Sequence, residues 1–266
     1  MSILEAIILG IVQGLTEFLP VSSSGHLELA KVLFGQGSVG EESMLFTIVL
    51  HGATALSTVV VFRNDIADIF KGLFKFEWNA ETKFVAYILV SMIPVFIIGM
   101  LFRHEIESLF TGNIILVGAA LIFTGILLYS TTRIPVQEDG KITFKRALII
   151  GIAQAVAVLP GVSRSGSTIS VALLAGVSRE RAARFSFLMV LPVIFGAMIL
   201  DFKDFTEVQP GRSIDNYSLM AGFVAAFIAG LFACSWMIKI VKKAKLDYFA
   251  YYCFAVGLIA LIYGIL

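Results

Sequence analysis

The chain has 266 residues, of which 58% are hydrophobic and only 15% are charged, and its formal net charge is +1. A soluble domain carries about 25% charged residues, so this composition excludes a cytosolic enzyme, a disordered chain and a disulfide-rich secreted protein. The small net charge also argues against a nucleic-acid partner, which would require a basic surface. The composition therefore predicts a polytopic membrane protein.

Six stretches are apolar enough to cross a bilayer, whose hydrocarbon core of about 30 Å needs roughly 20 helical residues. In chain order they are residues 44–62, 83–102, 113–131, 183–200, 217–238 and 247–266. Two further apolar stretches, 2–35 and 145–176, are interrupted by polar turns that contain Gly, Pro and Ser. Their arms are short for separate spans, which favours re-entrant helical hairpins.

The two interrupted stretches resemble each other. A shift of 141 positions places Gly10-Ile11-Val12-Gln13 on Gly151-Ile152-Ala153-Gln154, and a shift of 139 places Val117-Gly118 on Val256-Gly257. We therefore expect an all-α protein with one membrane domain, residues 1–266, made of two repeats, 1–135 and 140–266. Each repeat would be a re-entrant hairpin followed by three transmembrane helices.

Three spans per repeat are an odd number, so the second repeat must be inverted relative to the first. On that topology most of the 20 Lys and Arg residues lie on one side of the membrane. That side holds Arg63, Lys71, Lys75, Lys83, Arg133, Lys141, Lys145, Arg146, Arg179, Arg181, Arg184, Lys239, Lys242, Lys243 and Lys245. The opposite side holds only Lys31, Arg103, Lys203 and Arg212. The positive-inside rule makes the first side cytoplasmic, so both termini are predicted to be extracytoplasmic.

Hairpins that enter from opposite faces bring their turns together near the bilayer midplane. Each turn precedes a helix N-terminus, where free N–H groups and the helix dipole favour anions. Arg164 is the one basic residue at this depth, and an unpaired guanidinium there costs roughly 3 kcal/mol. Glu17 is the candidate partner, with Gln13 one helical turn before it. The turns also supply His26 and seven hydroxyls, from Ser22, Ser23, Ser24, Ser163, Ser165, Ser167 and Thr168.

An Arg fork, amide donors and hydroxyls together predict phosphate recognition. A serine hydroxyl or a water could attack phosphorus, with His26 or Glu17 moving the proton. The alternatives are structural: an Arg164–Glu17 ion pair without catalytic role, serines that only cap helices, and a core histidine at position 26. His51, in an apolar run without polar neighbours in sequence, is expected to be structural.

The two turns carry a resemblance to a known family. Residues 13–26 read QGLTEFLPVSSSGH, and residues 160–168 read PGVSRSGST. These resemble the signature motifs of the undecaprenyl-diphosphate phosphatase (bacitracin-resistance) family, [E/Q]xxxE with a Ser-rich turn and His, and PGxSRSxxT. Many relatives have Glu where this chain has Gln13, which weakens any site that needs two carboxylates for a metal ion.

The resemblance implies hydrolysis of undecaprenyl diphosphate to undecaprenyl phosphate and inorganic phosphate, which recycles the carrier for peptidoglycan synthesis and confers bacitracin resistance. By position it implies that the catalytic residues are Glu17, Ser23, His26 and Arg164. The residues it implies for substrate binding are Gln13, Ser22, Ser24, Ser163, Ser165 and Thr168. It also implies support by Mg²⁺ or Ca²⁺, with Glu17 as the candidate ligand.

The same resemblance implies a polyprenyl diphosphate lipid as substrate, the bacterial cytoplasmic (inner) membrane as location, and an active site that opens to the extracytoplasmic side. A homodimer is a further expectation. The competing function is a secondary transporter or lipid flippase, because inverted repeats with broken helices at the midplane are also transporter architecture.

Overall fold

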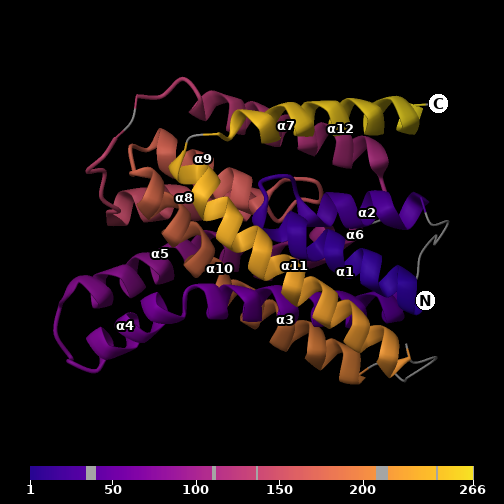
Figure 1. The fold of residues 1–266 in the computed structure, drawn as a ribbon, viewed down its shortest axis with the longest axis horizontal. Helices are drawn as coiled ribbons and strands as arrows, with labels where there is room; N and C mark the ends of the chain where they lie inside the picture. The colour runs from indigo at the N-terminus through magenta and orange to yellow at the C-terminus, as the bar shows by residue number, and fades with distance from the viewer. Residues whose placement is uncertain (34–39, 110–111, 136, 208–214, 244, 266) are drawn as a thin grey trace.

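The structure is a computed structural model that describes residues 1–33, 40–109, 112–135, 137–207, 215–243 and 245–265. Within these ranges the chain forms helices and turns, and no strand occurs (Figure 1). The helices in chain order are α1 (Ile3–Phe18), α2 (Ser23–Leu33), α3 (Gly40–Val61), α4 (Arg63–Leu73), α5 (Ala80–Leu101), α6 (Arg103–Ser108), α7 (Ile114–Thr131), α8 (Phe144–Val156), α9 (Arg164–Leu174), α10 (Arg179–Glu207), α11 (Asn216–Lys242) and α12 (Asp247–Ile265). Arg212 and the last residues of the stretches predicted at 2–35 and 247–266 lie outside the described ranges.

Five helices in the described ranges are long and apolar enough to cross a membrane, namely α5, α7, α10, α11 and α12. Each coincides with a predicted span. The sixth predicted span is α3, which continues into α4 across a bend of 75°. Large apolar side chains on these helices, such as Phe96, Phe232 and Ile259, are more than half exposed, as expected for a surface that contacts lipid. The prediction of an all-α polytopic membrane protein is confirmed.

The two interrupted stretches each form two helices joined by a short turn, α1–α2 and α8–α9, with the breaks where they were predicted. In the first turn Ser22 has φ +72°, a left-handed backbone conformation that residues other than glycine seldom adopt. In the second turn Gly161 has φ +89°, and a Cβ there would lie 2.8 Å from the Val117 carbonyl oxygen. Glycine is therefore required at position 161 for both its backbone conformation and its close packing.

The two turns contact each other, as predicted. The Ser165 hydroxyl of the second hairpin donates to the Leu19 carbonyl of the first at 3.1 Å. The Gly161 N–H donates to the Ser24 hydroxyl at 3.4 Å. Residues more than 130 positions apart in sequence thus build one shared site.

Several glycines at which two helix backbones approach closely occupy corresponding positions in the two proposed repeats. A Cβ on Gly10 of α1 would collide with the Gly222 carbonyl of α11, and one on Gly151 of α8 with the Ser91 carbonyl of α5. Gly118 of α7 and Gly257 of α12 face each other. A Cβ on Gly118 would lie 2.9 Å from the Gly257 carbonyl oxygen, and a Cβ on Gly257 would lie 2.8 Å from the Gly118 carbonyl oxygen. Such small residues let helix backbones approach closely in a membrane. This pairing is what two related halves would produce, and the inverted relation between them remains a prediction.

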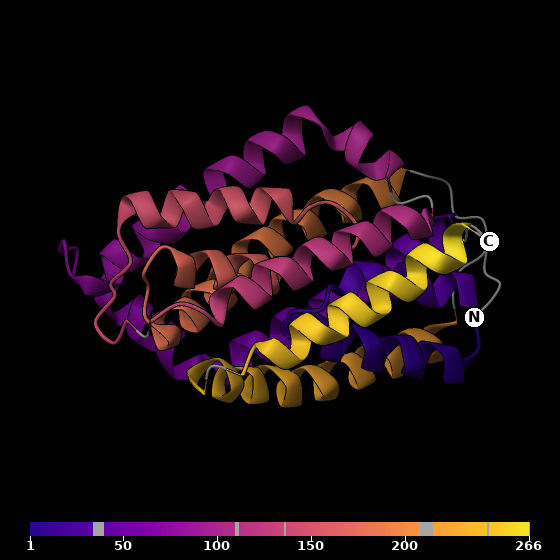
Figure 2. The ribbon, with the colours of Figure 1, turned by 90° about the horizontal axis from the view of Figure 1, so that it is seen from above.

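Both termini lie at one end of the helix bundle (Figures 1 and 2). The junctions α4–α5, α7–α8 and α11–α12, which carry many of the basic residues predicted to be cytoplasmic, lie at the opposite end (Figure 1). At the start of α10, Arg184 forms an ion pair with Asp65 of α4 at 2.5 Å, and Glu180 pairs with Lys242 of α11 at 2.8 Å. Many of the basic residues predicted to be cytoplasmic thus lie at the end of the bundle away from the termini, as the positive-inside prediction requires.

Candidate active site

An ion pair joins the two hairpins. Glu17 lies in the last turn of α1, Arg164 is the first residue of α9, and their Oε1 and Nη2 atoms are 2.5 Å apart. The second oxygen of Glu17 accepts hydrogen bonds from Gln13 Nε2 at 3.0 Å and from Ser23 Oγ at 2.9 Å. Both side chains are largely buried, with 8% of Glu17 and 15% of Arg164 exposed. An arginine at membrane depth requires an anionic partner, and the partner of Arg164 is Glu17, as predicted.

The ion pair lies between the hairpins because each hairpin has its helix break immediately beside one of the two charged residues. Helix α1 stops at Leu19-Pro20, so Glu17 stands at its end and faces the start of α2, where Ser23 is the first residue. Behind the carboxylate, Phe18 and Phe187 of α10 are buried with ring centroids 5.9 Å apart. This aromatic contact fixes the end of α1 against α10.

Helix capping accounts for two of the serines. Ser22 Oγ accepts from the Gly25 N–H at 3.2 Å, and Ser163 Oγ accepts from the Gly166 N–H at 3.1 Å. Ser22 and Ser163 therefore act as helix caps, and their part in substrate binding remains a prediction. The capping alternative does not hold for Ser23, whose hydroxyl is directed to Glu17.

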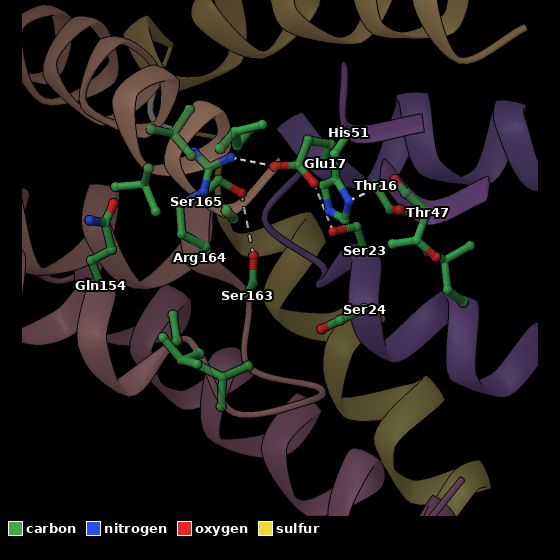
Figure 3. Close-up of a pocket in the computed structure, with 18 of the residues that line it drawn as sticks. Thr16, Glu17, Ser23, Ser24, Thr47, His51, Gln154, Ser163, Arg164 and Ser165 are labelled. Carbon is green, nitrogen blue, oxygen red and sulfur yellow. Dashed lines mark hydrogen bonds and ion pairs between the residues drawn. The ribbon is translucent and has the colours of Figure 1, made fainter. Parts of the chain in front are cut away.

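A cavity of about 380 Å³ opens beside the ion pair, between the two hairpins and helices α3, α5 and α10 (Figure 3). Its polar lining consists of Thr16, Glu17, Ser23, Ser24, Glu28, Thr47, His51, Gln154, Ser163, Arg164 and Ser165. Its apolar lining consists of Leu27, Ile48, Val95, Ala157, Val158, Val162, Val190, Val193, Ile194, Ala197 and Met198. A cavity with charged residues in one part and aliphatic walls elsewhere is suited to a ligand that has an anionic head and a hydrocarbon tail.

Most predicted site residues line this cavity. Three others lie outside the lining and contact residues that belong to it. The lining residues are Glu17, Ser23, Ser24, Ser163, Arg164 and Ser165. Gln13 is buried and holds Glu17, and Ser22 caps α2. Thr168 donates to the Arg164 carbonyl at 2.9 Å and contacts the Ser186 hydroxyl of α10 at 2.5 Å, so it braces the start of α9.

His26 points away from the cavity. Its Nδ1 lies 2.8 Å from the Ser22 carbonyl oxygen, and its Nε2 lies 2.8 Å from the Tyr252 hydroxyl of α12. The imidazole also stacks on the Tyr252 ring, with centroids 5.6 Å apart. Both ring nitrogens thus have partners, as the structural alternative requires, but the side chain is only half-buried, and the catalytic role of His26 remains a prediction.

Five polar residues of the cavity were missed by sequence reasoning: Thr16, Glu28, Thr47, His51 and Gln154. His51 was expected to be structural because its neighbours in sequence are apolar. Folding instead places it beside Glu17 and Thr16, with its Nδ1 3.0 Å from the carbonyl of Thr47 (Figure 3). The one signal available in the sequence concerned Gln154, which is the counterpart of Gln13 under the shift of 141 positions.

The side chains that the structure describes do not by themselves form a complete cation site. Among the described residues no group of three or more His, Cys, Asp or Glu side chains is arranged to hold a metal ion. Both oxygens of Glu17 already accept hydrogen bonds, and the neutral Gln13 stands one turn away. This donor set fits a cation that is shared with substrate phosphate oxygens, as Mg²⁺ is often bound, and does not fit one held by protein alone.

The chain is similar over nearly its whole length to proteins of one family. Residues 6–259 match the family of the bacitracin resistance protein BacA. The chain is 55% identical over 266 residues to a protein of Christiangramia forsetii named undecaprenyl-diphosphatase, with 99% of each chain covered. It is 50% identical to a protein of the same name from Bacteroides fragilis, with 97% of each covered, and 39% identical to one from Methanobrevibacter smithii, with 97% of this chain and 96% of that one covered. The chain therefore belongs to the bacitracin resistance protein BacA family.

Proposed function

We propose that this chain acts as an undecaprenyl-diphosphatase, hydrolysing undecaprenyl diphosphate to undecaprenyl phosphate and inorganic phosphate in the cavity between the hairpins. The observation that carries the proposal is the connected set Arg164–Glu17–Ser23 beside a cavity with aliphatic walls. The reaction recycles the lipid carrier of peptidoglycan synthesis and so opposes bacitracin.

In the proposed mechanism Arg164 binds the terminal phosphate, helped by the backbone N–H groups at the start of α9. The anionic substrate competes with Glu17 for the guanidinium, which leaves the carboxylate free to accept a proton. Ser23, whose hydroxyl already donates to Glu17, attacks the terminal phosphorus as its proton passes to that carboxylate. The bond from phosphorus to the bridging oxygen breaks, and undecaprenyl phosphate leaves. Water then hydrolyses the phosphoserine and releases inorganic phosphate.

Phosphate release by the purified protein in detergent micelles, where no transmembrane gradient exists, tests this function. An enzyme releases phosphate there, whereas a transporter or flippase moves lipid only across the bilayer of a liposome. A protein that moves the lipid in liposomes and releases no phosphate in micelles would contradict the proposal.

We expect a divalent cation to bind together with the substrate. Glu17 would hold it alongside phosphate oxygens, and when bound it would neutralise phosphate charge. EDTA should therefore lower phosphate release, and added Mg²⁺ or Ca²⁺ should restore it. Calorimetry of the substrate-free protein should show no tight cation binding, because the motif at residues 13–26 supplies only one carboxylate, that of Glu17, as a ligand for the cation. Full activity in EDTA would contradict this expectation.

The topology is proposed to be that of a multi-pass protein of the bacterial cytoplasmic membrane with both termini outside. The segregation of basic residues from the termini supports it, and so does the position of the cavity. The part of α3 that lines the cavity is its N-terminal half, which lies toward the end of the bundle that carries the termini (Figure 1). The same placement supports an extracytoplasmic opening.

Thiol labelling of intact cells checks this orientation. Both native cysteines, Cys234 and Cys253, are buried, so single introduced cysteines give the signal. A membrane-impermeant maleimide should label Ser2→Cys in intact cells and should label Lys75→Cys only after lysis. The reverse pattern would place the termini in the cytoplasm. The homodimer remains a prediction, which the mass of the protein in detergent would test.

A further inference from the structure

The amide of Gln154, on α8, is buried in the cavity wall without a hydrogen-bond partner. Only 2% of the residue is exposed, it lines the cavity, and neither Oε1 nor Nε2 has a partner. A buried polar group left unpaired loses its hydration without compensation, so such groups in native proteins call for an explanation. The explanation that the cavity offers is a ligand with oxygen atoms.

The counterpart of Gln154 in the first hairpin is used differently. Gln13 donates its Nε2 to Glu17 and does not line the cavity, so its role is to hold the carboxylate. Ser170 on α9 also has a buried hydroxyl without a partner, yet it too lies outside the cavity lining. Among the described residues, Gln154, Ser167 and Ser170 have buried side-chain polar atoms that are all without a partner, and of these three only Gln154 lines the cavity where a substrate would bind.

The surroundings of Gln154 indicate which part of the substrate it meets. Arg164 lies between Gln154 and the Glu17–Ser23 pair (Figure 3). Apart from Gln154, the residues that α5, α8 and α10 contribute to the described cavity lining are all apolar. The phosphate attacked by Ser23 must lie on the Glu17 side of Arg164. The space on the Gln154 side is therefore left for the second phosphate and the start of the hydrocarbon chain.

We propose that Gln154 binds the lipid-side phosphate, which leaves with the prenyl chain, and thereby selects a lipid diphosphate over a phosphomonoester. This inference rests on the proposed function. Nε2 donates to a non-bridging phosphate oxygen. Oε1 can accept from the Arg164 guanidinium, whose Nη1 makes only a long contact, 3.5 Å, to the Ser186 carbonyl. Gln154 would thus hold the leaving group and Arg164 together.

Product inhibition of the full-length protein in micelles tests the inference. The variant Gln154→Met keeps the length of the side chain and removes both hydrogen-bonding atoms. It should weaken inhibition by undecaprenyl phosphate about 10-fold and raise KM for the diphosphate by a similar factor, as expected for one hydrogen bond to a charged group. Inhibition by inorganic phosphate should stay at the wild-type level, because that product leaves from the Ser23 side. The variant Gln154→Glu should lose more, since its charge repels the phosphate.

The matched control is Ser170→Ala, which removes a buried unpaired hydroxyl outside the cavity and should keep wild-type kinetics. Thermal unfolding of each variant checks folding, and if Gln154→Met does not fold, Gln154→Asn, which keeps the amide but shortens it, replaces it with the same expectation. Unchanged inhibition by undecaprenyl phosphate, or equal weakening by both products, would overturn the inference. If wild-type protein releases no phosphate at all, the proposed function fails instead, so the two failures are distinguishable.

Discussion

Replacing Arg164 with Met should lower phosphate release from undecaprenyl diphosphate by about 10³-fold or more, the range seen when an arginine that stabilises a transferring phosphoryl group is lost. Arg164 is the one Lys or Arg residue in the described cavity lining. Arg164→Lys should recover only part of the rate, because a point charge cannot reproduce the bidentate fork. Initial rates in detergent micelles measure both effects.

A single Arg164 variant has a second consequence that must be separated from catalysis. Removing one partner of a buried ion pair leaves Glu17 charged and unpaired, which destabilises a protein by about 3–5 kcal/mol. The double variant Glu17→Gln/Arg164→Met is neutral at both positions and should unfold closer to the wild-type temperature than Arg164→Met does. It should remain inactive. If it regains turnover together with stability, the ion pair is only structural and the assignment of Arg164 to phosphate binding is wrong.

Replacing Ser23 with Ala should abolish formation of a phosphoenzyme and lower turnover by roughly 10³- to 10⁶-fold, as for other hydrolases that lose their nucleophile. The hydroxyl is 2.9 Å from a carboxylate that can take its proton, and no other serine of the two turns has that contact in the described structure. Acid quenching after reaction with substrate labelled in the terminal phosphate should leave label on wild-type protein and none on Ser23→Ala.

Ser24→Ala is the matched control for Ser23. Ser24 lines the same cavity, but its hydroxyl contacts Ser22 Oγ at 3.3 Å and accepts from the Gly161 N–H. Its loss should reduce activity modestly and leave the label in place. If wild-type protein carries no label and Ser23→Ala keeps full activity, water attacks the terminal phosphorus directly. In that case Glu17 would act on the water.

Composition and pattern determined the class of the protein and the outline of its site. In lipid the backbone polar groups of a long apolar run must be hydrogen-bonded within the protein, which a helix achieves, so the spans could be placed by residue number. Turns that contain Gly, Pro and Ser interrupt two of the apolar stretches, which placed the hairpins. The energetic cost of a charge at membrane depth selected Arg164 and predicted its pairing with Glu17. Both follow from the energetic cost of placing polar and charged groups in hydrocarbon, which residue types alone reveal.

Only the tertiary structure decided which polar side chains share the cavity. His26 and His51 are equally suitable in chemistry, and the sequence favoured His26 because it follows the serine turn. A helix presents different residues to different neighbours, so the ring of His26 turns to Tyr252 on α12, whereas His51 on α3 faces Glu17. Gln13 and Gln154 likewise match in sequence, yet one is bound to Glu17 and the other stands unpaired in the cavity wall. Packing between helices that are distant in sequence makes these choices, and local sequence does not encode them.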